Sequence, residues 1–255
     1  MPSSEKPNII RDFSRKRESY FTLNYGTETP GNYLRRLRRR LIVEAVGDVA
    51  AAASVLDAGC GPVILYPEIF ERCSRYEALD LTPSNLEQVG QTTQSPKLTC
   101  VLGDLDLMEW QKAAYDVVIC SGAMEYTTNP REVLTRMVAS VKSGGLLVCS
   151  FPNSWSPYRI WGEYAYTPIS QAWHRWRGEP VARYSRKLFS PRDVQAWLAD
   201  DGRRIEVQYF GYNFFLQPLD RLLAKLDYSL AMHLQTAPPA LLRPSSSEFL
   251  LIVRC

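Results

Sequence analysis

The sequence predicts an α/β fold with a mostly parallel, seven-stranded sheet, helices on both of its faces and an antiparallel last strand. From residue 54 onward, short apolar runs alternate with helix-length segments, which is the pattern of βαβ units. The stretch Val55–Val63, VLDAGCGPV, follows the first apolar run with a glycine-rich turn, where such sheets bind ligands. With 255 residues, 45% of them hydrophobic, the chain can form one large domain or two small ones.

The expected elements follow in chain order. Residues 1–18 are polar and are expected to be a frayed arm, whereas Tyr33–Val46 is expected to be an amphipathic helix. The next strands are expected at Ser54–Asp57, Tyr76–Asp80, Leu98–Leu102, Asp116–Cys120 and Leu146–Phe151, with helices at Pro67–Cys73, Pro83–Gln91 and Pro130–Val141. After residues 152–188 come a helix that begins at Ser190, a strand at Arg204–Phe210, a helix at Asp220–Leu230 and a strand at Glu248–Val253.

This order divides the chain into an arm and basic helix at 1–48 and an α/β domain at 49–255. Residues 152–188 interrupt the domain and hold four of the six tryptophans. Residues 1–40 carry ten basic and four acidic side chains, a net charge of +6, although the whole chain has a net charge of only +3.

The remaining composition indicates a cytoplasmic protein. The first residues contain no apolar segment of a secretory signal, and no apolar run approaches the ~20 residues that cross a bilayer. The six cysteines are scattered without a C-x-x-C pair, which favours free thiols in a reducing compartment. With two histidines in the chain, no metal site is expected.

The glycine turn is either a simple strand-to-helix turn or a ligand loop. A P-loop is excluded because no G-K-[ST] follows, and Ile64 stands where a dinucleotide fingerprint has its third glycine. Asp80 ends the second strand 19 residues after Gly61, where a carboxylate can accept both hydroxyls of a ribose. Asp104 follows the third strand and can accept from an adenine amino group. Three acids at three successive strand ends favour an adenosine site.

Five motifs in chain order extend this interpretation: VLDAGCG, ALD, GDLD, YDVVICSGAMEYTTNP and LTRMVASVKSGGLLVCSFPN. They resemble the successive motifs of class I S-adenosylmethionine-dependent methyltransferases, which have a Rossmann-like fold. The likeness is greatest to the ubiquinone and menaquinone biosynthesis group and covers roughly Leu34 to Pro152. It implies S-adenosylmethionine as cofactor and S-adenosylhomocysteine as product.

The resemblance also implies roles for single residues. Gly59 and Gly61 approach the methionine part, Asp57 orients the loop or the cofactor amino group, and Arg40 binds the cofactor carboxylate, with Arg36 as a second candidate. The full set implied for the cofactor is Arg40, Asp57, Ala58, Gly59, Gly61, Asp80, Leu81, Asp104, Leu105 and Ser121.

The acceptor side departs from the family pattern. Glu125-Tyr126 stands where the family often has Glu-His, so an expected imidazole is missing, and Pro62 replaces a small residue of the loop. A base is needed only if the acceptor must lose a proton, as a phenol must. The candidates for catalysis are Glu125 and His174; the bland interpretations are a helix-start acid and an ordinary packed or surface histidine.

Residues 152–188 follow the fifth strand and are expected to form an aromatic substrate lid over the carboxyl end of the sheet. The alternative is a small hydrophobic subdomain or a dimer contact. The residues expected to contact the acceptor are Tyr20, Tyr25, Tyr126, Asn153, Trp155, Tyr158 and Arg159.

The expected reaction is methyl transfer to an oxygen or nitrogen of a small, partly apolar acceptor. One alternative is an RNA or protein methyltransferase recruited by the basic N-terminal segment; another is a non-catalytic, cofactor-binding partner protein. Cys120-Ser121-Gly122-Ala123 lacks the Asn/Asp-Pro-Pro-aromatic box of base methylation, which argues against nucleic acid. The arginine-rich helix is a solvated face or a peripheral membrane contact. The oligomeric state stays open.

Overall fold

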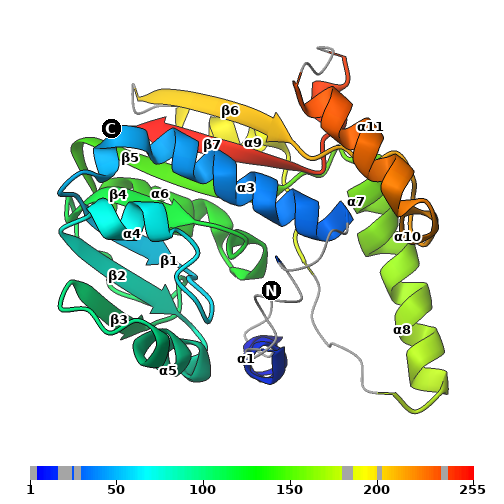
Figure 1. Cartoon of the computed structure of the whole chain (residues 1–255), viewed down its shortest axis with the longest axis horizontal. Helices are drawn as coiled ribbons and strands as arrows, with labels where there is room; N and C mark the ends of the chain where they lie inside the picture. Colours follow the sequence, from blue (N-terminus) through cyan, green and yellow to red (C-terminus); the bar gives the residue numbers. More distant parts are fainter. Residues whose placement is uncertain (1–4, 17–24, 26–29, 180–185, 200–202, 237–240) are drawn as a thin grey trace.

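The sheet has seven strands in the order β3-β2-β1-β4-β5-β7-β6 (Figure 1). The computed structural model describes residues 5–16, 25, 30–179, 186–199, 203–236 and 241–255. All neighbouring strands pair in parallel except β7, which runs antiparallel to both β5 and β6. The predicted fold class is therefore confirmed, with β7 inside the sheet and β6 at its edge. The strands are β1 Ser54–Ala58, β2 Arg75–Asp80, β3 Leu98–Leu102, β4 Tyr115–Cys120, β5 Val141–Pro152, β6 Arg204–Phe210 and β7 Glu248–Arg254.

Prolines begin many of the helices, because their fixed φ suits the first helical position and their missing N–H costs nothing there. At the start of α9 the Ser190 hydroxyl also accepts a hydrogen bond from the Asp193 N–H, as expected for an N-cap. Among the described helices, none has the length and apolar character that crossing a membrane requires. The helices are α1 Lys6–Lys16, α3 Pro30–Val46, α4 Pro67–Arg72, α5 Pro83–Thr92, α6 Pro130–Ser140, α7 Pro157–Trp161, α8 Thr167–Trp176, α9 Pro191–Ala196, α10 Leu219–Leu222 and α11 Ala224–Thr236, with a 3-10 turn η3 at Met124–Tyr126 and a π-helical turn η4 at Gly162–Tyr166.

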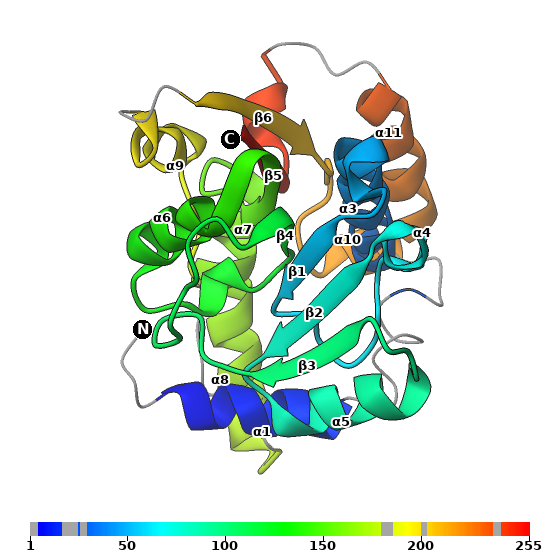
Figure 2. The same cartoon turned by 90° about the vertical axis from the view of Figure 1, so that its left-hand side faces the viewer.

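The core has two halves, one on each face of the sheet. Alternate strand residues point to opposite faces, so Val55 belongs to one half and Leu56 to the other. Helices α3, α4 and α5 cover the first face, and α6 and α9 cover the second (Figure 2). Because α3 packs into the same core as β1, the predicted boundary at residues 48 and 49 does not separate two cores.

Two segments differ from the sequence expectation. Residues 6–16 are not a frayed arm but form α1, in which Ile9 is buried and packs toward the body of the protein. Residues 157–176, for which no helix was expected, form α7, η4 and α8. Composition misled both predictions: the charged residues of α1 hid its apolar face, and the aromatic segment shows no clean helical period.

Glu248, at the start of β7, connects two helices that are far apart in sequence. Its carboxylate forms ion pairs with Arg38 of α3, at 3.2 Å, and with Arg159 of α7. All three side chains are at most 15% exposed, so the charges are shielded from water. Removing the anion would leave two buried cations without their carboxylate, which is far more costly than losing an exposed pair.

We expect Glu248→Gln to lower the free energy of unfolding by about 3 kcal/mol, because it removes the charge between Arg38 and Arg159. Urea denaturation followed by circular dichroism measures this. The matched control is Glu44→Gln, which removes the partner of another α3 arginine, Arg40, where both side chains are 60% exposed. That change should cost less than about 0.5 kcal/mol. Equal losses in the two variants would contradict the assignment.

Candidate functional site

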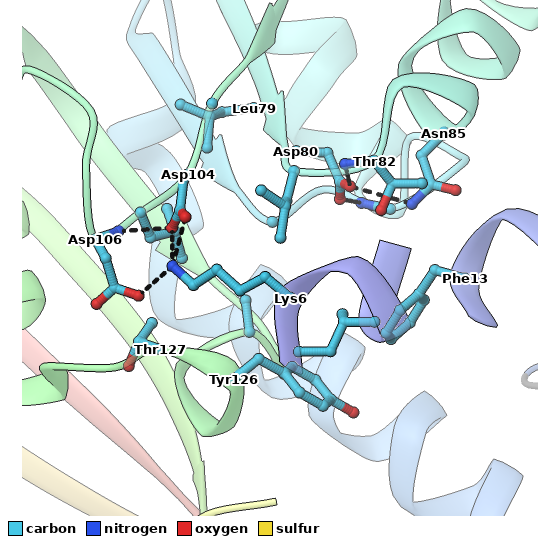
Figure 3. A pocket seen from close by; sticks show the side chains of 18 of the residues that line it. Lys6, Phe13, Leu79, Asp80, Thr82, Asn85, Asp104, Asp106, Tyr126 and Thr127 are labelled. Carbon is cyan, nitrogen blue, oxygen red and sulfur yellow. Dashed lines mark hydrogen bonds and ion pairs between the residues drawn. The ribbon is translucent and has the colours of Figure 1, made fainter. Parts of the chain in front are cut away.

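A cavity lies at the carboxyl ends of β1, β2, β3 and β4, between the turns that follow them and helix α1. It encloses about 720 Å³, including its open mouth. Side chains from separate parts of the chain meet there (Figure 3). Eight residues that the sequence singled out line it: Gly59, Gly61, Asp80, Leu81, Asp104, Leu105, Ser121 and Tyr126.

The glycine loop is held tightly against its neighbours. Gly59 and Gly61 have φ of +83° and +70°, in the left-handed region that favours glycine. A Cβ on Gly59 would lie 2.5 Å from the Cβ of Ala123, so the loop touches the turn after β4. The N–H groups of Gly59 and Cys60 donate to the Leu79 carbonyl at 2.7 and 3.0 Å. The loop backbone is therefore exposed to the cavity in one fixed conformation.

Hydrogen bonds from two separate turns hold the Asp80 carboxylate. One oxygen accepts from the Gly61 N–H at 2.8 Å, and the other accepts from the Thr82 N–H at 2.8 Å. The Asn85 amide donates to the same carboxylate at 3.2 Å. Burial raises the pKa of Asp80, although the backbone hydrogen bonds from Thr82 and Gly61 partly offset it. The carboxylate is thus fixed in place at the cavity wall.

An unsatisfied acceptor lies beside it. The Oδ1 atom of Asn85 is buried and has no hydrogen-bond partner among the described residues, although Asn85 lines the cavity. A buried acceptor without a donor is rare in native proteins and indicates that a ligand or water supplies one. The Asp80 carboxylate at the cavity wall therefore fits the hydroxyl groups of a ribose.

Helix α1 contributes residues that the sequence analysis missed. It lies beside α5 and crosses below the carboxyl ends of β2 and β3 (Figure 2). The Lys6 ammonium contacts Asp104 and Asp106, each at 2.6 Å. Burial lowers the pKa of Lys6, but these two carboxylates outweigh burial and raise it. The spacing of Lys6, Ile9 and Phe13, three and four residues apart, is the helical signal that would have identified this face.

The turn after β4 forms the opposite wall. Gly122 has φ of +71°, and its N–H donates to the Ser150 hydroxyl at 2.9 Å. Tyr126 lines the cavity and meets the ring of Phe13 edge-on, with centroids 5.7 Å apart. Helix α1 and this turn therefore close the cavity from two sides.

The arginine that approaches this wall is Arg38, not Arg40. A Cβ on Gly122 would lie 3.1 Å from the Arg38 guanidinium. Arg40 is 60% exposed and pairs with Glu44, and Arg36 donates to the Tyr25 carbonyl. Arg40 does not lie at the cavity because its position in the helix turns it to solvent, which spacing in the sequence could not show.

Asp57 and Ala58 lie behind the loop, in β1, and do not line the cavity. The Asp57 carboxyl is fully buried and accepts the hydroxyl of Tyr76 at 2.7 Å. Burial raises its pKa to about 7, despite the hydrogen bond from Tyr76. Its position suits support of the loop and not direct contact with a ligand.

The two predicted catalytic residues lie in different surroundings. Glu125, in η3, is buried, and its Oε2 atom has no hydrogen-bond partner among the described residues. Burial raises the pKa of this carboxyl, which the charges of Arg186 and Arg38 partly offset. His174 lies on α8, where its Nδ1 contacts Glu179 at 2.5 Å, and it is not a cavity residue.

Most of the predicted acceptor-binding residues serve the scaffold instead. The Asn153 amide donates to the carbonyls of Pro244 and Ser246 at 2.7 and 2.8 Å. The Tyr158 hydroxyl donates to Asp220 at 2.8 Å. Five of them do not line the cavity, namely Tyr25, Asn153, Trp155, Tyr158 and Arg159, and Tyr20 lies outside the described residues.

None of the described residues of the aromatic segment lines the cavity. Trp161, Trp173 and Trp176 are exposed, and α8 extends along one side of the molecule (Figure 1). The segment does follow β5 at the carboxyl edge, as expected. The sequence shows that the segment is rich in aromatic residues, but composition alone does not tell which way the rings point.

Comparison with known proteins agrees with this geometry. A family model described as a methyltransferase domain matches residues 56–149, which include the strand ends and turns that line the cavity. A ubiquinone biosynthesis O-methyltransferase from Cronobacter sakazakii is 25% identical over 254 residues, covering 93% of this chain and 99% of that protein. A second one, from Xanthomonas euvesicatoria, is 25% identical over 171 residues and covers 61% of this chain and 64% of its own length.

The chain contains a methyltransferase domain, and the relatives and the fold together support a class I S-adenosylmethionine-dependent methyltransferase. Solved structures share the fold of this methyltransferase. The magnesium protoporphyrin IX methyltransferase of Synechocystis, with bound S-adenosylhomocysteine, superposes with a TM-score of 0.63 at 14% identity and covers 98% of this chain and 100% of that chain. The N-methyltransferase NodS of Bradyrhizobium japonicum gives 0.58 at 13% identity, covering 97% and 98%.

The cofactor of the methyltransferase is S-adenosylmethionine, and the cavity fits it. A Cβ on Gly59 would clash with Ala123, so the loop backbone stays bare, and the oriented Asp80 offers acceptors for hydroxyl groups. When bound, the cofactor supplies an electrophilic methyl group.

The buried Asp57 generates a prediction about pH. In the folded protein the Asp57 carboxyl keeps its proton up to about pH 7, whereas in the unfolded chain an aspartate loses its proton near pH 4. The stability that the protonated Asp57 carboxyl contributes is thus lost as the pH rises through this range. Asp57→Asn cannot titrate, so its free energy of unfolding relative to wild type should rise by up to about 4 kcal/mol between about pH 4 and pH 8.

Urea denaturation at both pH values measures this difference. The control is Asp116→Asn: burial raises the pKa of Asp116, but hydrogen bonds from Lys142 and Ser54 lower it to about 2. Asp116 stays ionised throughout the range, so its variant should show a constant difference from wild type. A constant difference for Asp57→Asn as well would contradict the role of burial.

Proposed function

We propose that this methyltransferase transfers the methyl group to an oxygen or nitrogen of a small, partly apolar acceptor. The similarity over nearly the whole chain to a ubiquinone biosynthesis O-methyltransferase supports an acceptor of this kind. The observation that carries the proposal is the buried Glu125, whose carboxyl has a raised pKa and an unpartnered oxygen. A hydroxyl or amine that must lose a proton needs such a base.

The cofactor side of the proposal rests on Asp80. Its carboxylate accepts the ribose hydroxyls, with Asn85 as a further acceptor, while Gly59 and Gly61 allow the methionine part to approach their backbone. Leu81 and Leu105 border the adenine ring, Ser121 faces the sulfonium end, and Asp104 accepts from the adenine amino group. Lys6 shares Asp104 and so neutralises part of its charge.

We expect Asp80→Ala to weaken the binding of S-adenosylhomocysteine by about 10- to 100-fold, because it removes a charged acceptor of two hydroxyl groups. Calorimetric titration measures the affinity, with NAD as a ligand that should not bind. Asp116→Ala, an acid at the amino end of β4, is the control and should bind as wild type. If Asp80→Ala bound the product with unchanged affinity, the ribose assignment would be withdrawn.

The acceptor side rests on the turn after β4. Tyr126 of η3 lines the cavity, and its neighbour Glu125 is buried beside it. The end of the 152–188 segment is fastened to this turn, because the Lys187 ammonium donates to the carbonyls of Thr127 and Thr128 at 2.8 and 2.7 Å. We therefore place the acceptor between η3 and this segment, which borders the acceptor instead of forming a separate lid.

Glu125→Gln should reduce kcat by about 100-fold or more on alkyl-substituted phenols and amines, because general base catalysis is worth 10²- to 10⁴-fold. The wild-type rate should rise with pH as the carboxyl ionises, and that limb should vanish in the variant. Product binding should be unchanged. The control is Glu132→Gln, which changes an exposed side chain of α6 and should leave both turnover and product binding unchanged. Turnover equal to wild type at every pH would exclude Glu125 as the base.

The alternative of recruitment through the basic helix has less support. Arg38 pairs with Glu248, Arg39 with Glu68 at 2.5 Å and Arg40 with Glu44. These charges are engaged within the protein and do not form a continuous basic strip. No specific observation favours an RNA or protein acceptor over a small molecule.

A further inference from the structure

Exposed apolar side chains are concentrated on one part of the molecule. Of the eighteen large hydrophobic side chains that are exposed among the described residues, sixteen lie between Ile160 and Leu242. Helices α7, α8, α10 and α11 carry most of them, on the side opposite β3 (Figure 1). Such concentration is unusual for a water-facing surface and marks an interaction site. The apolar flank, as we name it, is defined by Ile169, Trp173, Trp176, Leu219, Leu222 and Leu226.

The α8 part of the apolar flank has the geometry of an amphipathic helix. Ile169, Trp173 and Trp176 follow one another at spacings of four and three, so they share one face. They are 64%, 55% and 78% exposed, and the two indole rings lie 5.2 Å apart. None of this face is used by the cavity or by the core.

The second part of the flank is joined to the first. Leu219, Leu222 and Leu226 on α10 and α11 are 51%, 78% and 50% exposed. The Trp161 indole N–H donates to the Gln217 carbonyl at 2.7 Å, which fastens the end of α7 beside the start of α10. The two parts of the flank are therefore connected where α7 meets the start of α10.

The charges on this surface are predominantly positive. Arg175 and Lys225 are exposed beside the apolar residues. The acidic side chains of this region are buried or paired. Asp220 and Asp227 are buried, and Glu179 pairs with His174 and Arg177. Glu163, on the turn before α8, is partly buried. Tryptophan and leucine beside arginine and lysine are the composition of surfaces that enter the headgroup layer of anionic membranes.

We propose that the apolar flank docks on the surface of an anionic lipid bilayer, with its rings and leucines in the headgroup boundary and its cations at the lipid phosphates. This surface replaces the arginine-rich helix α3 as the membrane contact, since three of the five α3 arginines form ion pairs within the protein. The inference goes beyond the proposed function and does not depend on which acceptor is methylated.

The test is co-sedimentation of the full chain with vesicles of phosphatidylcholine, alone or mixed with phosphatidylglycerol in equal parts. Wild type should bind the mixed vesicles, bind less at high salt, and shift its tryptophan emission to the blue. Trp173→Ser with Trp176→Ser should reduce the partition coefficient about tenfold or more. Arg175→Ser with Lys225→Ser should reduce it about tenfold and weaken the salt dependence.

The controls change matching residues elsewhere. Leu102→Ser and Leu107→Ser remove the two exposed hydrophobic side chains outside this region, and Arg40→Ser with Arg72→Ser removes two exposed cations. These variants should bind vesicles as wild type does. All variants except those at Leu102 and Leu107, which flank cavity residues, should also keep the wild-type affinity for S-adenosylhomocysteine, which separates this test from that of the cavity.

Two results would overturn the proposal. One is wild type that sediments with neither kind of vesicle. The other is a tryptophan double variant that binds mixed vesicles as strongly as wild type. A dimer that dissociates in that variant, without vesicle binding by wild type, would assign the flank to a second copy of the chain instead.

Discussion

The carboxylate of Asp80 is the point on which the cofactor site depends. It receives the N–H of Gly61 from the loop after β1 and the N–H of Thr82 from the turn after β2, so two separate turns share one anion. This is feasible because β1 and β2 are parallel neighbours, with Ala58 opposite Leu79, and therefore end side by side. The glycine loop is shaped by the second strand as much as by its own sequence.

A second set of charges attaches the helices at the sides of the sheet to this site. Lys6 fastens α1 to the turn after β3, and Glu248 fastens α3 and α7 to the start of β7. Both anchors lie at the same carboxyl edge as the cavity. Helix α1 is therefore a wall of the cavity, and α3 and the segment after β5 are held together at the same edge.

The sequence alone predicted those residues of the site whose positions follow from the order of the strands. Gly59, Gly61 and Asp80 lie where alternating strands and helices must place them, because parallel strands end at one edge. It was insufficient where a side chain's direction depends on tertiary packing. Arg40 and Arg38 are two residues apart on one helix, yet one faces solvent and the other faces Gly122. The tryptophans of residues 152–188 show the same limit. Their composition predicted a lid over the cavity, whereas in the folded chain several of them face solvent.

The place of β7 in the sheet has a consequence for how the chain acquires its fold. The β6 strand leaves the ribosome before β7, but its sole neighbour in the sheet is β7. The β5 edge and the β6 strand have no other partner on that side of the sheet, and unpaired strand edges favour aggregation. Completion of the sheet therefore depends on residues 248–254, whose pairing with β5 joins segments far apart in the sequence.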